Sequence, residues 1–82
     1  RYLRDIENPK SRLYCAIAAY NAGTSSVMRT LTGQSSISSS VNTINRMHPN
    51  DVLRKLVRQM PSSETRDYVN KVLSLQKNYG QL

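Results

Sequence analysis

The sequence has few of the residues that form metal sites, disulfides and aromatic cores. Its 82 residues include one cysteine, Cys15, and one histidine, His48, with neither phenylalanine nor tryptophan. One Cys and one His cannot supply an internal disulfide or a four-ligand zinc site. We therefore expect no metal and no cofactor, and a core of small aliphatic side chains.

Long apolar segments and acidic residues are also scarce. The longest apolar run, residues 13–20, has eight residues, whereas a membrane-spanning helix needs about 20. Five acidic residues stand against twelve basic ones, a net charge of +7, which favours anionic partners such as nucleic acid, lipid headgroups or an acidic polysaccharide. The sequence starts at Arg1 without an initiating Met or an apolar signal region. We expect residues 1–82 to be a single partial domain from a longer protein.

Turn residues and apolar spacing predict an all-α fold of about five short helices with short connections. Asn8 and Pro9 form a helix start, and the first helix is predicted over about 10–21, with Gly23 as its C-terminal cap. Its apolar face is predicted to hold Leu13, Ala16, Ile17 and Tyr20.

Four further helices are predicted along the rest of the chain. Thr24 can cap a short one that Gly33 stops, and a weak helix over the serine-rich stretch that follows is favoured over disorder. An amphipathic helix begins after His48 and ends at Pro61, and the last begins at Ser62 or Ser63 and ends at Gly80. The apolar positions of the last helix are Tyr68, Val69, Val72, Leu73, Leu75 and Tyr79.

Residues for catalysis are few. An acid/base enzyme needs a carboxyl group whose pKa is raised in an apolar pocket. Of the five carboxylates only Glu64 is a candidate, yet its place in a first helical turn before Arg66 stabilises the charged form. His48 lies in a turn with no serine elbow nearby, and Cys15 is interpreted as a buried inert thiol. The basic residues are interpreted mainly as solvated helix faces, with anion binding as the alternative.

Two sequence motifs are far more specific to one kind of protein than these single candidate residues. The segment Ala19-Tyr20-Asn21-Ala22-Gly23 resembles the Ala-Tyr-Asn-Ala-Gly signature of the lysozyme-like lytic transglycosylases of bacterial cell walls. About forty residues later, Glu64-Thr65-Arg66 followed by Tyr68-Val69 and Lys71-Val72 resembles that family's later motif. The order and spacing agree, and the resemblance spans nearly the whole chain. It implies the C-terminal portion of a lysozyme-like (goose-type, SLT) domain.

The resemblance implies an enzyme that cleaves the bond between N-acetylmuramic acid and N-acetylglucosamine in peptidoglycan without water. The muramyl 6-hydroxyl attacks, which gives a 1,6-anhydro product. The family's general acid is a glutamate in a Glu-Ser motif that precedes a Gly-Leu-Met-Gln segment, and this sequence contains neither motif. We therefore expect the catalytic acid to lie upstream of Arg1 and the present chain to be the inactive substrate-binding half.

The resemblance also implies roles for five residues. Tyr20 would hydrogen-bond the catalytic acid and help to position it, with its ring buried and its hydroxyl turned to the cleft. Asn21 suits the acetamido and hydroxyl groups of an amino sugar. Gly23 would allow a left-handed turn or a close backbone approach. Glu64 and Tyr68 would receive the glycan or the peptide, and for Tyr20, Gly23 and Tyr68 simple packing and capping remain alternatives.

Partners and location follow from the same resemblance. Peptidoglycan glycan strands are the expected partner, in the bacterial cell envelope on the periplasmic side of the outer membrane, and no nucleic acid is expected. The alternative is a small basic helical module that binds nucleic acid or another protein. Self-association of the fragment is expected through the faces of Leu13/Ile17 and Val72/Leu75, which the missing half would cover.

Overall fold

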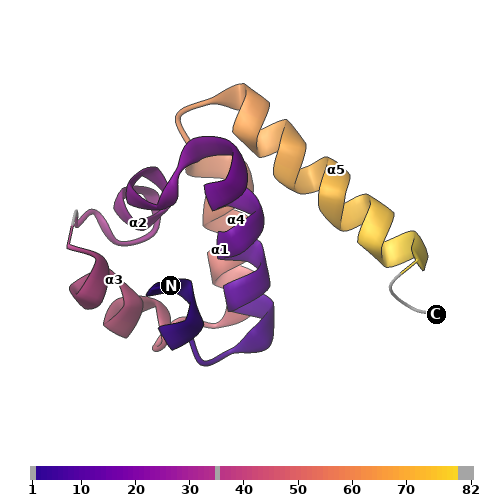
Figure 1. Ribbon diagram of the computed structural model, residues 1–82. Coiled ribbons are helices and arrows are strands. Elements are labelled where there is room, and N and C mark those ends of the chain that lie inside the picture. The colour runs from indigo at the N-terminus through magenta and orange to yellow at the C-terminus, as the bar shows by residue number, and fades with distance from the viewer. Residues whose placement is uncertain (1, 35, 80–82) are drawn as a thin grey trace.

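The described part of the chain consists of helices and short connections, as predicted. The structure, a computed structural model, describes residues 2–34 and 36–79, with the side chains of residues 3–34 and 36–75. Within these ranges there is a 3-10 turn and five helices and no strand (Figure 1). The elements are η1 (Tyr2–Asp5), α1 (Pro9–Ala22), α2 (Thr24–Thr32), α3 (Ile37–Ile44), α4 (Pro49–Gln59) and α5 (Ser63–Tyr79). Gly80, the predicted end of the last helix, and the side chain of Tyr79 lie outside the described part.

The helix ends follow the capping residues. The Asn8 side-chain oxygen accepts hydrogen bonds from the backbone N–H groups of Lys10 (2.9 Å) and Ser11 (3.2 Å), so the predicted start of α1 is confirmed. Gly23 ends α1 and has φ of 90° and ψ of 150°, a backbone conformation that favours glycine. Thr24 was expected to cap the next helix, but it is the first helical residue, because Gly23 occupies the capping position.

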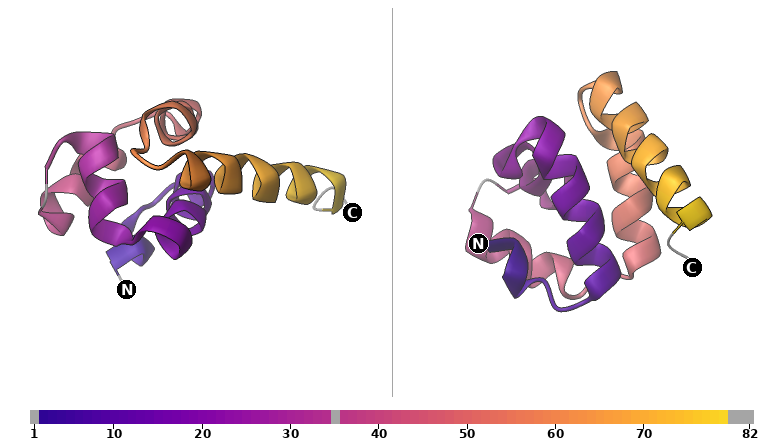
Figure 2. Two further views of the ribbon diagram at one scale, coloured as in Figure 1. Left: turned by 90° about the horizontal axis from the view of Figure 1, so that it is seen from above. Right: turned by 45° about the vertical axis from the view of Figure 1, so that its right-hand side comes forward.

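Helix α1 lies at the centre of the arrangement. It contacts α2, α4, α5 and η1. Helices α1 and α4 run in the same direction, and α5 returns antiparallel beside them (Figure 2). The C-terminal part of α5 projects away from the other helices (Figures 1 and 2). The two segments that carry the family motifs are therefore neighbours in space.

The core is aliphatic and sulfur-containing, in agreement with the composition. Val41 and Ile44 are buried, which confirms the helix predicted in the serine-rich stretch. On that helix the buried Ser40 shares a hydrogen bond of 2.9 Å with the Thr32 hydroxyl. The buried apolar residues are Ile6, Cys15, Ile17, Ala18, Val27, Met28, Leu31, Val41, Ile44, Val52, Leu56, Met60 and Val69.

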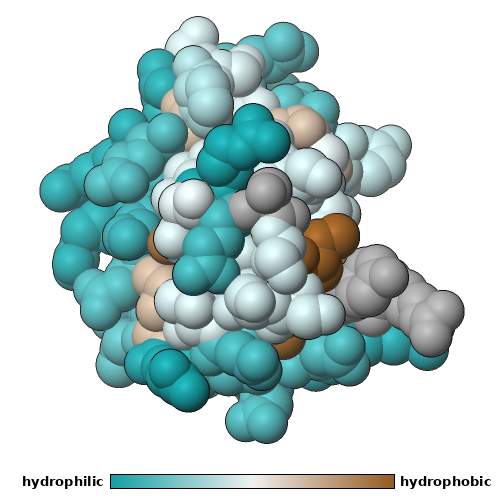
Figure 3. Space-filling model, turned by 90° about the vertical axis from the view of Figure 1, so that its left-hand side faces the viewer, coloured by the Kyte–Doolittle hydropathy of each residue, from teal (hydrophilic) through white to brown (hydrophobic). Residues whose placement is uncertain are grey.

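The predicted apolar face of α1 is wrong in part. Ile17 is buried, but Ala16 is exposed and Leu13 is only half-buried. Because neighbours surround α1 on several sides, Ser11, Cys15 and Ala18 are buried as well, and a single apolar stripe does not describe the helix. On the molecular surface over α2 and α3, apolar residues are exposed only in small separate areas (Figure 3).

Asn45 joins two distant parts of the chain. Its side-chain oxygen accepts a hydrogen bond of 2.8 Å from the Glu7 backbone N–H, and its Nδ2 donates one of 3.1 Å to the Asp5 carbonyl. These bonds hold the segment after η1 against the end of α3, and Ile6 between them is fully buried.

We expect Asn45→Ala to lower the free energy of unfolding by about 1–3 kcal/mol, since it removes two hydrogen bonds to backbone groups. Chemical denaturation measures the change. Asn42→Ala is the matched control, because Asn42 is exposed on α3, just before Asn45, and its side chain makes no hydrogen bond within the described residues. Equal stability of the two variants would contradict the role assigned to Asn45.

Cys15 lies in the core, which agrees with its interpretation as an inert thiol. The residue is fully buried. Burial raises the pKa of the thiol from 9.0 to about 12, because the thiolate would lose its hydration. The folded chain therefore keeps the thiol proton in a pH range in which the unfolded chain releases it.

This difference makes stability fall as the pH rises from 9.0 towards 12. Relative to Cys15→Ala, the free energy of unfolding of the unmodified chain should fall by about 1.4 kcal/mol for each pH unit in that range. Urea denaturation of both proteins at about pH 8 and about pH 10.5 measures the difference. Parallel pH dependence in the two proteins would show that the thiol does not titrate as described.

Candidate functional site

The five residues expected at the site come from the end of α1 and the start of α5. Tyr20 and Asn21 lie in the last turn of α1, and Gly23 follows the helix. Glu64 and Tyr68 lie in the first turns of α5. Although more than forty residues separate the two segments, a hydrogen bond and an aromatic contact join them directly. The structure thus brings the two sequence motifs together.

The aromatic contact is between Tyr20 and Tyr68. Their ring centroids are 6.2 Å apart and the rings are inclined by 23°, a stacked arrangement. Tyr20 is 84% exposed, whereas Tyr68 is half-buried. The expectation that the Tyr20 ring is buried with only its hydroxyl in a cleft is wrong in this chain, since the contact with Tyr68 leaves most of the Tyr20 side chain uncovered. Tyr20 instead presents an aromatic surface to solvent.

The hydrogen bond is between Thr65 and Asn21. The Thr65 hydroxyl donates to the side-chain oxygen of Asn21 at 2.6 Å, and Thr65 is 1% exposed while Asn21 is exposed. Sequence reasoning passed over Thr65 as a functional residue, although it is the middle residue of the Glu-Thr-Arg motif. Its place in the middle of that motif is the one signal in the sequence that indicates the importance of Thr65.

Arg66, the third residue of that motif, fixes the start of α5. Its guanidinium donates a hydrogen bond to the Met60 carbonyl at the end of α4. The side chains of Thr65 and Arg66 therefore both join α5 to its neighbours, and Glu64 before them remains exposed. Glu64 is placed in the first helical turn, where the helix dipole favours a negative charge.

Gly23 is explained by its backbone and not by close packing. A Cβ atom built there would meet no atom within 4 Å, so the chain itself leaves room for a side chain. The positive φ of 90° is the reason for glycine. The sequence left two explanations for Gly23 open, a special backbone conformation and a close approach of another backbone. The structure supports the special backbone conformation.

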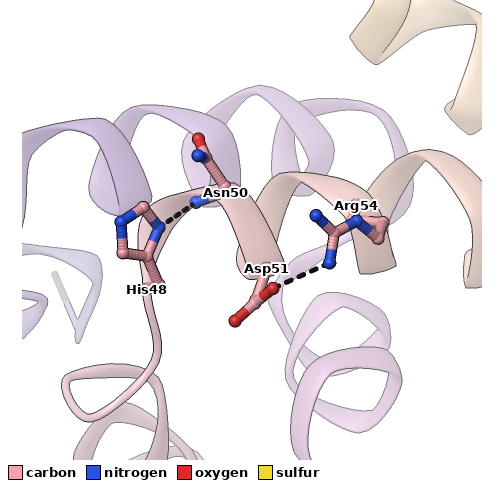
Figure 4. Close-up of polar contacts among 4 residues, drawn as sticks. All are labelled: His48, Asn50, Asp51 and Arg54. Carbon is pink, nitrogen blue, oxygen red and sulfur yellow. Dashed lines mark hydrogen bonds and ion pairs between the residues drawn. The ribbon is translucent and has the colours of Figure 1, made fainter.

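None of the five carboxylates lies in an apolar pocket. Each belongs to an exposed residue, and Asp51 is paired with Arg54 at 2.9 Å (Figure 4). The residues concerned are Asp5, Glu7, Asp51, Glu64 and Asp67. A carboxyl group that acts as a general acid usually lies in an apolar pocket that excludes water, and these exposed surroundings do not provide one.

Basic residues gather along α4, the helix that precedes the second motif. A hollow of about 320 Å³ is lined by Met47, Asp51, Arg54, Lys55, Arg58 and Gln59. Two of its cations are already engaged, since Arg54 pairs with Asp51 and Lys55 donates to the Leu31 carbonyl at 3.3 Å. His48 beside it caps α4 by accepting a hydrogen bond of 3.1 Å from the Asn50 N–H (Figure 4). His48 thus has a structural role at this helix start.

Comparison with known proteins identifies strong similarity to one group of enzymes. The chain is 49% identical over 78 residues to a membrane-bound lytic murein transglycosylase C of Pectobacterium atrosepticum, which covers 95% of the chain. Proteins of the same name from Salmonella typhimurium and Edwardsiella ictaluri are 46% and 44% identical. The chain spans only about 21–22% of the length of these relatives. No family model matches the chain.

These similarities confirm the resemblance to the lytic transglycosylases that the motifs indicated. They give no support to the alternative of a nucleic-acid-binding module. Within the described residues, no helix is both long and apolar enough to cross a membrane.

Proposed function

Because the chain resembles the lytic murein transglycosylases over nearly its whole length, we propose that it is the substrate-binding part of a peptidoglycan lytic transglycosylase. The enzyme cleaves the bond between N-acetylmuramic acid and N-acetylglucosamine, and the muramyl 6-hydroxyl attacks to give a 1,6-anhydro product. The observation that carries the proposal is the meeting of the two motifs at one exposed surface, through the Asn21–Thr65 bond and the Tyr20–Tyr68 stack.

The exposed groups at this surface suit a glycan strand. Tyr20 offers an apolar ring face and a hydroxyl, and the neighbouring Asn21 offers a polar amide. A pyranose ring has an apolar face and polar substituents, so it can use both. Glu64 and Tyr68 continue the surface along α5, and Gly23 lets the chain turn sharply beside it.

The general acid of the reaction comes from outside this chain. Glycoside cleavage needs a positioned proton donor for the leaving oxygen, and all five carboxylates here are exposed. In the proposed enzyme the acid lies upstream, and the Tyr20 hydroxyl accepts or donates a hydrogen bond that positions it. Tyr20 is a positioning residue in this proposal, and Asn21, Gly23, Glu64 and Tyr68 form the substrate surface.

The names of the relatives place them at membranes, and for this chain they favour the cell envelope. We propose the periplasmic side of the outer membrane, where peptidoglycan is accessible, and glycan strands as the partner.

We further propose that the chain alone self-associates. Of the residues expected to drive this, Ile17 is buried and Leu13 and Val72 are half-buried, so the contact would use Leu75, which is 47% exposed, together with Tyr20.

The chain by itself should release no anhydromuropeptides from purified peptidoglycan, because no carboxyl group is placed to protonate the leaving oxygen. Mass spectrometry of the soluble products checks this, and circular dichroism on the same sample checks that the chain is helical. Robust formation of anhydromuropeptides by the folded chain would contradict the assignment of the acid to another segment.

In the longer enzyme, Tyr20→Phe should lower turnover by roughly 10- to 150-fold, the effect of losing a hydrogen bond of about 1.5–3 kcal/mol to a charged or reacting group. The thermal midpoint should hardly change, because the substitution removes only the hydroxyl and keeps the ring that stacks on Tyr68. Turnover and melting are measured on one preparation. Unchanged turnover with a lower melting temperature would instead give Tyr20 a structural role.

A further inference from the structure

We propose that the hollow along α4 is a binding site for an acidic peptide, which it holds by two carboxylate groups. The hollow has a volume of about 320 Å³, at the small end of the range of ligand pockets. It is lined by three cations, Arg54, Lys55 and Arg58, and by the carboxylate of Asp51. None of its lining residues belongs to the two family motifs. Binding here would therefore be separate from binding at the glycan surface proposed above.

The charges at the hollow come from one side of α4. Successive turns of the helix contribute Asp51, then Arg54 and Lys55, then Arg58. Residues three or four apart lie on the same side of a helix, and Figure 4 shows Asp51 and Arg54 together there. Three cations and one carboxylate leave an excess of two positive charges. This excess matches a ligand that carries two negative charges.

The three cations keep hydrogen-bond donors that the protein does not use. Arg54 contacts Asp51 through Nη1 at 2.9 Å, and Lys55 donates to the Leu31 carbonyl at 3.3 Å. Arg58 is exposed, and within the described residues its guanidinium makes no hydrogen bond or ion pair. A guanidinium has five N–H donors and an ammonium has three. Because a guanidinium can present two N–H groups to one carboxylate, Arg58 is the principal residue of the proposed site.

The other residues of the hollow favour a peptide over a lipid surface or a nucleic acid. Met47 adds an apolar side chain and Gln59 an amide, which suit the side chains and backbone of a peptide. A helix that enters a lipid surface needs exposed apolar residues, yet Val52 and Leu56 of α4 are fully buried and its other apolar residues are half-buried. A nucleic acid presents a row of phosphates, whereas Asp51 places a negative charge among the cations here.

The probe is the acetylated dipeptide of alanine and glutamate, which carries two carboxylates and no cation. Its neutral counterpart is the acetylated dipeptide of alanine and glutamine with an amidated end. Binding to the 82-residue chain is followed by NMR titration at low ionic strength, because salt screens exposed charges. We expect the acidic peptide to shift the backbone amide signals of the residues that line the hollow, and the neutral peptide to leave them unchanged.

Arg58→Gln should raise the Kd of the acidic peptide by roughly 2- to 5-fold, since an exposed ion pair is worth up to about 1 kcal/mol. Arg29→Gln is the matched control. Arg29 is also exposed in the last turn of a helix, and its substitution changes the net charge equally, but it does not line the hollow. The Kd for Arg29→Gln should match that of the unmodified chain.

Asp51→Asn tests the site in the opposite direction. It removes the competing carboxylate, releases Arg54 and raises the charge excess from two to three. The Kd of the acidic peptide should therefore fall by roughly 2- to 5-fold. Asp67→Asn is the matched control, because Asp67 is exposed on α5 and lies outside the hollow. A loss of folding cannot produce the tighter binding that is expected of Asp51→Asn.

Three outcomes of the titrations would overturn the proposed site. These are equal weakening by Arg58→Gln and Arg29→Gln, which would show attraction by net charge alone, equal binding of the acidic and neutral peptides, and no binding of the acidic peptide. Vesicles of phosphatidylglycerol provide the last comparison. Binding to vesicles that Arg58→Gln weakens, without binding of the peptide, would assign the cations to a lipid surface and overturn the peptide site.

Discussion

The enclosure of α1 by its neighbours is the constraint on which the rest of the structure depends. Helices α2, α4 and α5 all pack on it, and its small buried residues, such as Ser11, Cys15 and Ala18, let them approach. Within the described residues, the side that carries Ala16 and Tyr20 is left open. The open side ends at the C-terminus of α1, where Thr65 of α5 binds Asn21, so packing itself decides which residues of the first motif reach solvent.

The sequence predicted most of the helix boundaries, because they depend on local chemistry. Asn8, Gly33 and Pro61 act within a turn of their own positions, and the structure places helix ends beside them. The surroundings of α1 could not be predicted in the same way. Apolar spacing assigns one buried face to a helix, whereas α1 is covered on several sides by segments distant in sequence, and so Tyr20 was wrongly placed in the interior.

The Glu-Thr-Arg motif shows why the site was only partly predictable. Its three consecutive residues differ in what they contact: Thr65 binds Asn21, Arg66 binds the Met60 carbonyl, and Glu64 remains exposed. Consecutive residues on a helix point about 100° apart, so one turn can join two neighbouring helices and still present a carboxylate. The motif indicated that the segment matters, but only the tertiary contacts divide these roles among its members.

The same openness that exposes Tyr20 bears on the proposal that the general acid comes from another segment. A carboxyl group acts as a general acid when a low-dielectric surrounding raises its pKa, and such a surrounding needs covered surface on both sides. Around Tyr20 and Tyr68 the chain supplies one covered side, formed by α1 and α5. In the proposed enzyme, another segment that covers this face would bury its own carboxyl group against the tyrosines. Binding surface and proton donor would then come from different parts of one domain, and burial of the Tyr20 face would create the acid's environment.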